Sequence, residues 1–371
     1  MMTNHPGLKK RNGKIEILRF VFAVMIVLNH SRYAVGDENC RFLGCSFAAE
    51  FFFLLSGYLM MHTVSRISSP PDGHLGRETR DFVLKKARSM WPEALIAWII
   101  NSCIYYRAYM YGQGLTQVVD FLKINIWELL FLGHTGLNSD AVNSAIWFVS
   151  SMLLCMAFMY PLLRRHTDLM SRVIFPLVAV FIMGYFAYSG STLRDPSKWM
   201  GWTYKGNLRA VALLGIGVAA YPVAQRLRGL TLTRLGKISL TCVEPLLYLS
   251  VIYYMCSQKA SLKDYYYILI LTLALIVTFS GQTYSEGKLD HAFARFLGRF
   301  SVPLYFGHFV WSRLIGRLWK ELSVDSRMLI YLCVSFATAT FICLTSALIR
   351  RWRVGTKLLR LFVREADSAA E

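Results

Sequence analysis

The stretch IEILRFVFAVMIVLNH, residues 15–30, contains two side chains that can do chemistry, Arg19 and His30. Arginine binds phosphate groups through two parallel N–H donors, and histidine can take a proton from a hydroxyl near neutral pH. Positions 19 and 30 are about three helical turns apart, so the two side chains point the same way, roughly 16 Å from each other. This spacing suits a donor with phosphates at one end and a reactive group on a long arm, as in coenzyme A.

The element that must position this pair is an apolar helix, and the whole chain is built from such segments. Its 371 residues are 55% hydrophobic and 17% charged, with a mean hydropathy of +0.40. Soluble chains carry about 25% charged residues. Apolar runs of about 20 residues, enough to cross about 30 Å of hydrocarbon, recur throughout. We predict an all-α integral membrane protein with about ten transmembrane helices. The predicted spans lie near residues 15–33, 46–64, 89–110, 144–163, 173–189, 206–224, 238–256, 265–282, 300–319 and 328–349.

The basic residues indicate how these helices are oriented. The formal net charge is +19, but most Lys and Arg residues fall between the apolar runs, on the side that contains both termini. This asymmetry predicts cytoplasmic termini and gives no support to nucleic acid as a partner. We expect a cytoplasmic N-tail (1–14), a transmembrane domain (15–349) and a basic cytoplasmic C-tail (350–371). The C-tail has the helical spacing of an anchor on membrane lipid. The only long outer segment, 112–143, contains an amphipathic helix.

Ionisable residues inside a membrane span usually face the protein interior or a watery cavity. Arg19 and His30 therefore predict a cavity that crosses the membrane along this first helix. A second explanation is that Arg19 reaches lipid headgroups and His30 lies at the membrane interface. The eight cysteines lack metal-ligand spacing, so no metal site is predicted. Cys40 and Cys45 share one outer loop, as a disulfide or as two free thiols.

Five stretches along the chain together resemble a known family. They are LRFVFAVMIVLNH (18–30), AEFFFLLSGYLM (49–60), FVLKKARSMWP (82–92), AIWFVSSMLLCMAFMYPLL (145–163) and LGRFSVPLYFGH (297–308). In this order they resemble motifs of the membrane-bound acyltransferase family 3, whose members O-acylate cell-surface glycans. The third stretch departs from the family pattern, because many members have regularly spaced arginines where this chain has Lys85, Lys86 and Arg88.

The resemblance suggests a role for each motif residue. His30 is the expected catalytic base, and Glu50, at a similar depth in the second span, is expected to hold its imidazole in one tautomer. A glutamate facing water at the outer rim fits the sequence equally well. The expected donor-binding residues are Arg19, Lys85, Lys86, Arg88, Ser56 and Gly57. The expected substrate-binding residues are Trp147, Tyr305 and His308.

Several of these residues also have simpler explanations. Ser56 and Gly57 suit close helix packing, and the basic cluster suits membrane orientation alone. Trp147, Tyr305 and His308 are residue types that more often belong to a core. In the outer loop, His134 is a weaker candidate for acceptor contact, and we expect it to be solvated.

The sequence thus predicts a multi-pass acyltransferase of the bacterial inner membrane. It would move an acetyl group from cytoplasmic acetyl-CoA to a hydroxyl of an extracytoplasmic or lipid-linked glycan, directly or through an acyl-histidine. The alternative is a secondary transporter or flippase, since intramembrane charges are equally expected there. A lack of visible repeat symmetry speaks against that alternative.

Overall fold

The helices form where the apolar runs were found, and the prediction of an all-α protein is confirmed. The computed structural model describes residues 12–67, 73–112, 114–137, 142–259 and 261–351. Within them the only β-type pairing is an isolated bridge between Trp199 and Tyr204. The helices are α1 (Gly13–His30), α2 (Arg32–Val35), η1 (Leu43–Phe47), α3 (Ala48–Val64), α4 (Leu75–Tyr105), η2 (Tyr106–Met110), α5 (Leu115–Leu129), η3 (Ser144–Ile146), α6 (Trp147–Arg165), α7 (Thr167–Leu169), η4 (Met170–Ile174), α8 (Phe175–Tyr188), α9 (Lys205–Arg228), α10 (Arg234–Ser257), α11 (Asp264–Ser280), α12 (Ala292–Gly307), α13 (Phe309–Leu318) and α14 (Val324–Arg351).

Six helical segments of the described chain are long and apolar enough to cross a membrane, which makes this a multi-pass membrane protein. They are Leu43–Val64, Trp147–Arg165, Thr167–Tyr188, Lys205–Arg228, Arg234–Ser257 and Val324–Arg350. Each coincides with a predicted span, and the predicted span 265–282 coincides with α11, a shorter apolar helix. The other three predicted spans correspond to α1, part of α4, and the pair α12 and α13, which are charged or short. The expectation of about ten spans is therefore met only in part.

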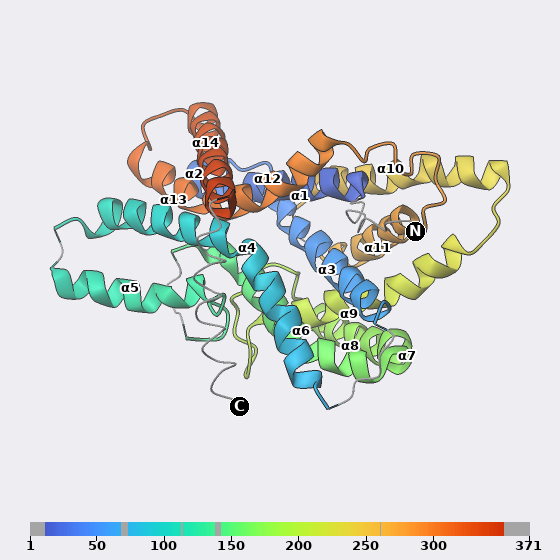
Figure 1. Cartoon of the computed structure of the whole chain (residues 1–371). Helices are drawn as coiled ribbons and strands as arrows, with labels where there is room; N and C mark the ends of the chain where they lie inside the picture. Colours follow the sequence, from blue (N-terminus) through green and yellow to red (C-terminus); the bar gives the residue numbers. More distant parts are fainter. Residues whose placement is uncertain (1–11, 68–72, 113, 138–141, 260, 352–371) are drawn as a thin grey trace.

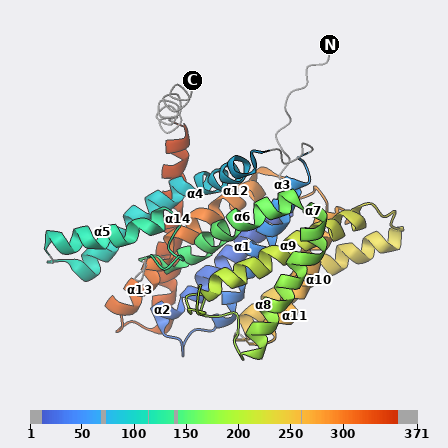
Figure 2. The same cartoon turned by 90° about the horizontal axis from the view of Figure 1, so that it is seen from below.

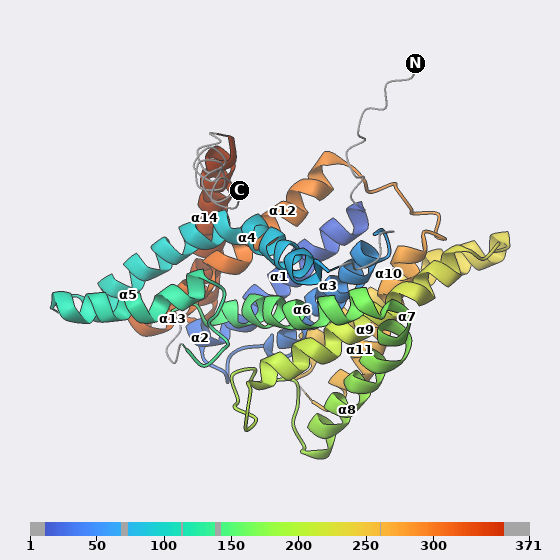
Figure 3. The ribbon, with the colours of Figure 1, turned by 60° about the horizontal axis from the view of Figure 1, so that its bottom comes forward.

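Helix α1 lies among the other helices and packs most extensively against α12 (Figure 1). It also contacts α3, whose apolar window is 78% buried within the protein, whereas that of α10 is only 17% buried. α10 therefore lies at the periphery, at the right-hand edge of Figure 2, and its exposed apolar side chains suit a lipid environment. α6 and α9 run side by side (Figure 3), and both pack against α3.

Two glycines allow α3 and α9 to touch through their backbones. A Cβ atom added at Gly57 would lie 2.1 Å from the carbonyl oxygen of Leu214, and one added at Gly217 would lie 2.1 Å from that of Leu54. Small residues let membrane helices approach this closely, because dispersion contacts rather than the hydrophobic effect hold them together. Gly57 thus packs against α9.

The segment 112–143 contains the expected amphipathic helix, α5, which lies beside the second half of α4 (Figure 1). The indole Nε1–H of Trp98 donates to the carbonyl oxygen of Asn125 at 3.0 Å and ties the two helices together. Cys40 and Cys45 are both buried free thiols. Most of the predicted N-tail (1–14) and C-tail (350–371) lies outside the described residues.

The close contact between α3 and α9 predicts that Gly217→Ala lowers the free energy of unfolding by about 1–3 kcal/mol. The new methyl group would overlap with the backbone of α3, so the two helices would have to move apart. The matched control is Gly184→Ala in α8, where an added Cβ has no neighbour within 4 Å. Apparent melting temperatures of the two variants in detergent test this. Equal melting temperatures would contradict the backbone contact.

Candidate active site

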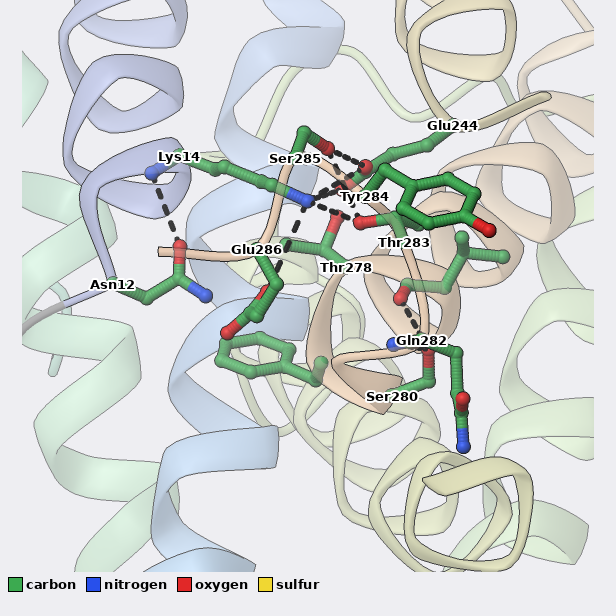
Figure 4. A network of polar contacts seen from close by, with 12 residues as sticks. Asn12, Lys14, Glu244, Thr278, Ser280, Gln282, Thr283, Tyr284, Ser285 and Glu286 are labelled. Carbon is green, nitrogen blue, oxygen red and sulfur yellow. Dashed lines mark hydrogen bonds and ion pairs between the residues drawn. The ribbon is translucent and has the colours of Figure 1, made fainter. Parts of the chain in front are cut away.

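The position of α1 is fixed at its N-terminal end. The side chain of Asn12 caps the helix by accepting hydrogen bonds from the backbone N–H groups of Lys14 (3.0 Å) and Ile15 (3.3 Å). The Lys14 ammonium donates to the Glu244 carboxylate at 2.8 Å and to the Thr283 hydroxyl at 2.8 Å (Figure 4). Both partners of this ion pair are buried, so the network joins α1 to α10 and to the segment after α11.

Two cavities lie along α1. The first, here called the Arg19 cavity, is about 270 Å³. Its polar lining residues are Arg19, Ser56, Lys86, Ser89, Ser301 and Tyr305. The second, the His30 cavity, is about 250 Å³. Its polar lining residues are Asn29, His30, Arg32, Tyr33, Ser46, Trp147, Arg194, Asp195, Ser197, Arg209 and Tyr305. One helix thus contributes a guanidinium to one cavity and an imidazole to the other.

Phe148 and Tyr305 line both cavities. Their rings contact edge to face, with centroids 6.1 Å apart, and the Tyr305 hydroxyl donates to the carbonyl oxygen of Ala145. The expectation of one continuous cavity is therefore wrong for this conformation. A slender arm that reaches from Arg19 to His30 has to displace these two rings.

His30 contacts a second histidine. Its Nδ1 lies 2.8 Å from Nε2 of His308, and Nδ1 of His308 lies 3.1 Å from the carbonyl oxygen of Leu304. Because a carbonyl only accepts, His308 donates from Nδ1, and its neutral ring accepts at Nε2 from the Nδ1–H of His30. This pattern leaves the lone pair on Nε2 of His30, which is the atom that a general base needs.

The break between α12 and α13 places His308 opposite His30. Where the helix stops, the carbonyl oxygen of Phe306 accepts hydrogen bonds from the side-chain amides of Asn143 (3.0 Å) and Asn101 (3.4 Å). Irregular buried backbone is stable only when such partners replace the lost helical bonds. The two asparagine side chains therefore stabilise the helix break, and the break positions the fully buried imidazole of His308.

Glu50 does not contact His30. Its carboxylate forms a buried ion pair with Arg209, including a hydrogen bond of 2.9 Å from Nε, and both side chains are at most 2% exposed. Arg209 also donates to the carbonyl oxygen of Leu193 at 2.7 Å and lies 5.1 Å from the ring centre of Trp147. The expectation that Glu50 orients His30 is therefore corrected. His308 occupies that position, and Glu50 fixes Arg209 in the wall of the His30 cavity.

The three residues of the basic cluster, Lys85, Lys86 and Arg88, differ in their position relative to the cavities. Lys86 lines the Arg19 cavity, whereas Lys85 and Arg88 are exposed and line neither cavity. Burial, followed by the nearby charge of Arg19, lowers the pKa of Lys86 to about 8. Ser56 lines the same cavity, with its hydroxyl 3.2 Å from the sulfur of Met152. Gly57 lines neither cavity.

The remaining candidates lie near the His30 cavity. Trp147 and Tyr305 line it, and His308 lies behind His30. His134 is buried, contrary to the expectation of a solvated loop residue. Its Nε2 lies 2.9 Å from the carbonyl oxygen of Pro196, and burial lowers its pKa. Phe148 and Arg194 were missed, since neither residue type stands out at its position in the sequence.

Comparison with known proteins identifies the family. The model of a family described as an acyltransferase domain, acyltransferase 3, matches residues 12–347, which is nearly the whole chain. The chain therefore belongs to this family, and the resemblance seen in the five sequence stretches is confirmed. Neither a curated protein nor a solved structure matches the chain.

The buried pair of Glu50 and Arg209 predicts a large stability loss in Arg209→Met, about 3–5 kcal/mol, because the glutamate is left buried and unpaired. The double variant Glu50→Leu/Arg209→Met should recover much of this loss. The matched control is Arg172→Met, which breaks an exposed pair with Asp168 and should have little effect. Apparent melting temperatures test this, and equal losses in the two single variants would contradict it.

Proposed function

We propose that this acyltransferase moves an acetyl group from cytoplasmic acetyl-CoA to a hydroxyl of an extracytoplasmic or lipid-linked glycan, in the bacterial inner membrane. The observation that carries the proposal is the placement of Arg19 and His30 in two cavities that meet at Phe148 and Tyr305. A donor that is charged at one end and reactive at the other fits this arrangement.

The donor's phosphates would bind at the Arg19 cavity. Arg19 provides a planar pair of N–H donors, and Lys86 provides a second positive charge in the same cavity. From there the pantetheine arm extends along α1, over the roughly 16 Å that separate the two side chains. The walls next to it are mostly apolar, with Phe52, Leu55 and Met152 among them, and suit an uncharged arm.

In the His30 cavity, Nε2 of His30 takes the proton from the acceptor hydroxyl. The resulting alkoxide attacks the thioester carbonyl carbon, the new C–O bond forms, and the C–S bond breaks. The leaving thiolate recovers the proton from the imidazolium, so that coenzyme A leaves as a thiol. In the acyl-histidine variant, the same nitrogen attacks the thioester first and then passes the acetyl group to the hydroxyl.

His308 acts through His30. Its hydrogen bond of 2.8 Å keeps the proton of His30 on Nδ1 and holds the ring in place. The carbonyl oxygen of Leu304 in turn keeps the proton of His308 on Nδ1. His308 is therefore proposed as the positioning residue, a role that a carboxylate takes in hydrolytic triads.

Replacement of His30 by Ala should lower the rate of acetyl transfer by about 10²–10⁴-fold, the usual contribution of a general base. Binding of acetyl-CoA should change little, because the phosphates bind at the other cavity. Purified protein with radiolabelled acetyl-CoA tests both quantities. Near-normal transfer by His30→Ala would contradict the mechanism, and a transporter would neither bind nor consume acetyl-CoA.

The pKa of about 8 at Lys86 predicts weaker acetyl-CoA binding as the pH rises from 7 to 9, because the ammonium loses its proton and its charge. Lys86→Met should bind the donor about tenfold more weakly at pH 7 and should lose this pH dependence. The adjacent, exposed Lys85→Met is the comparison. Equal effects of the two substitutions would contradict the assignment of Lys86 to the donor.

A further inference from the structure

Part of the wall of the His30 cavity belongs to the segment between α8 and α9, residues 189–204. Its residues Arg194, Asp195, Pro196 and Ser197 all line the cavity. Side chains from several elements form hydrogen bonds to the backbone carbonyl groups of this segment. Lys205 donates to the carbonyl oxygen of Arg194 at 2.8 Å.

Three further side chains hold the segment in place. Arg209 donates to the carbonyl oxygen of Leu193 at 2.7 Å, and the Tyr265 hydroxyl donates to that of Ser191 at 2.7 Å. The imidazole of His134 lies 2.9 Å from the carbonyl oxygen of Pro196. These hydrogen bonds to the backbone of the segment fix the position of Arg194 beside the cavity.

Two residues that line this cavity have polar side-chain atoms without a partner in the protein. Nη2 of Arg194 and Oδ1 of Asn29 are buried and have no hydrogen-bond partner among the described residues. A buried N–H of a charged group without a partner is costly, so Arg194 is stabilised if a bound molecule supplies an acceptor.

The charges of the cavity indicate the class of that molecule. Its lining contains the guanidinium groups of Arg32, Arg194 and Arg209 but, among the described residues, only one acid, Asp195. Arg209 is already paired with Glu50, and Arg32 lies 3.6 Å from Asp37. Arg194 has no ion-pair partner within the part of the chain that the structure describes. A guanidinium in such a site prefers a carboxylate or a phosphate, to which it donates two hydrogen bonds.

We infer that Arg194 binds an oxyanion of the acceptor, so that the acceptor is an anionic sugar whose hydroxyl reaches His30. The inference rests on the proposed function, because it assumes that the His30 cavity holds the acceptor. The oxyanion belongs either to an acidic sugar, as a carboxylate, or to a phosphate-linked sugar, as a phosphate. In both cases the chemistry at Arg194 is the same.

The test uses the full chain in detergent and three probes: glucuronate, glucose 1-phosphate and glucose. Binding is measured by titrating the apparent melting temperature. We expect at least one anionic probe to bind ten times more tightly than glucose. Arg194→Gln should remove this preference, whereas Arg194→Lys should keep part of it, because lysine retains the charge without the planar pair of donors. Arg41→Gln, at an exposed position before α3, is the matched control and should leave the preference unchanged.

Each outcome decides between the possibilities. A preference for glucuronate alone assigns an acidic sugar, and a preference for glucose 1-phosphate alone assigns a phosphate-linked sugar. Wild-type protein that binds neither anion more tightly than glucose would overturn the inference, as would an Arg194→Gln variant that keeps the preference. Acetyl-CoA binding is measured in parallel. If acetyl-CoA does not bind but the Arg194-dependent preference remains, the proposed function fails and the anion site stands.

Discussion

The structure depends on one constraint: α1 carries ionisable side chains into the protein interior, and these side chains need partners there. Lys14 pairs with Glu244, Arg19 lies 3.8 Å from Glu16, and His30 contacts His308. A buried ionisable group without a partner costs several kcal/mol. The contacts of Lys14 with Glu244 and of His30 with His308 join α1 to other elements and therefore fix its rotation and depth. The same fixed helix places a guanidinium and an imidazole in two cavities.

This constraint explains why composition identifies some helices as membrane spans and misses others. The six long and apolar helical segments include α3 in the interior of the protein and α10 at its periphery. The helices that fall short, α1, α4 and the pair α12 and α13, carry Arg19, His30, Lys86, Tyr305 and His308. The charged residues among them lower the apolarity by which a membrane helix is recognised, and partners within the protein offset the cost of burying these charges.

Much of the site followed from the sequence because helical geometry is rigid. Positions 19 and 30 share a face at any orientation of α1, and their type indicates phosphate and proton chemistry. The partner of His30 did not follow. Glu50 has a suitable depth, but depth does not fix the direction in which a side chain leaves its helix, and Arg209 on α9 takes that carboxylate. The helix break at His308 and the loop that positions Arg194 depend on tertiary contacts that one sequence does not reveal.

The contact between Phe148 and Tyr305 is where this arrangement has to move during the proposed reaction. Both rings line both cavities, so they lie between the proposed phosphate site and the proposed base, His30. The most direct measurement is a cryo-electron microscopy structure with a non-hydrolysable acetyl-CoA analogue. The account predicts phosphate density at Arg19 and Lys86, displaced Phe148 and Tyr305 rings, and the acetyl carbonyl beside Nε2 of His30. An analogue that binds with its acetyl end away from His30, or with both rings unmoved, would contradict it.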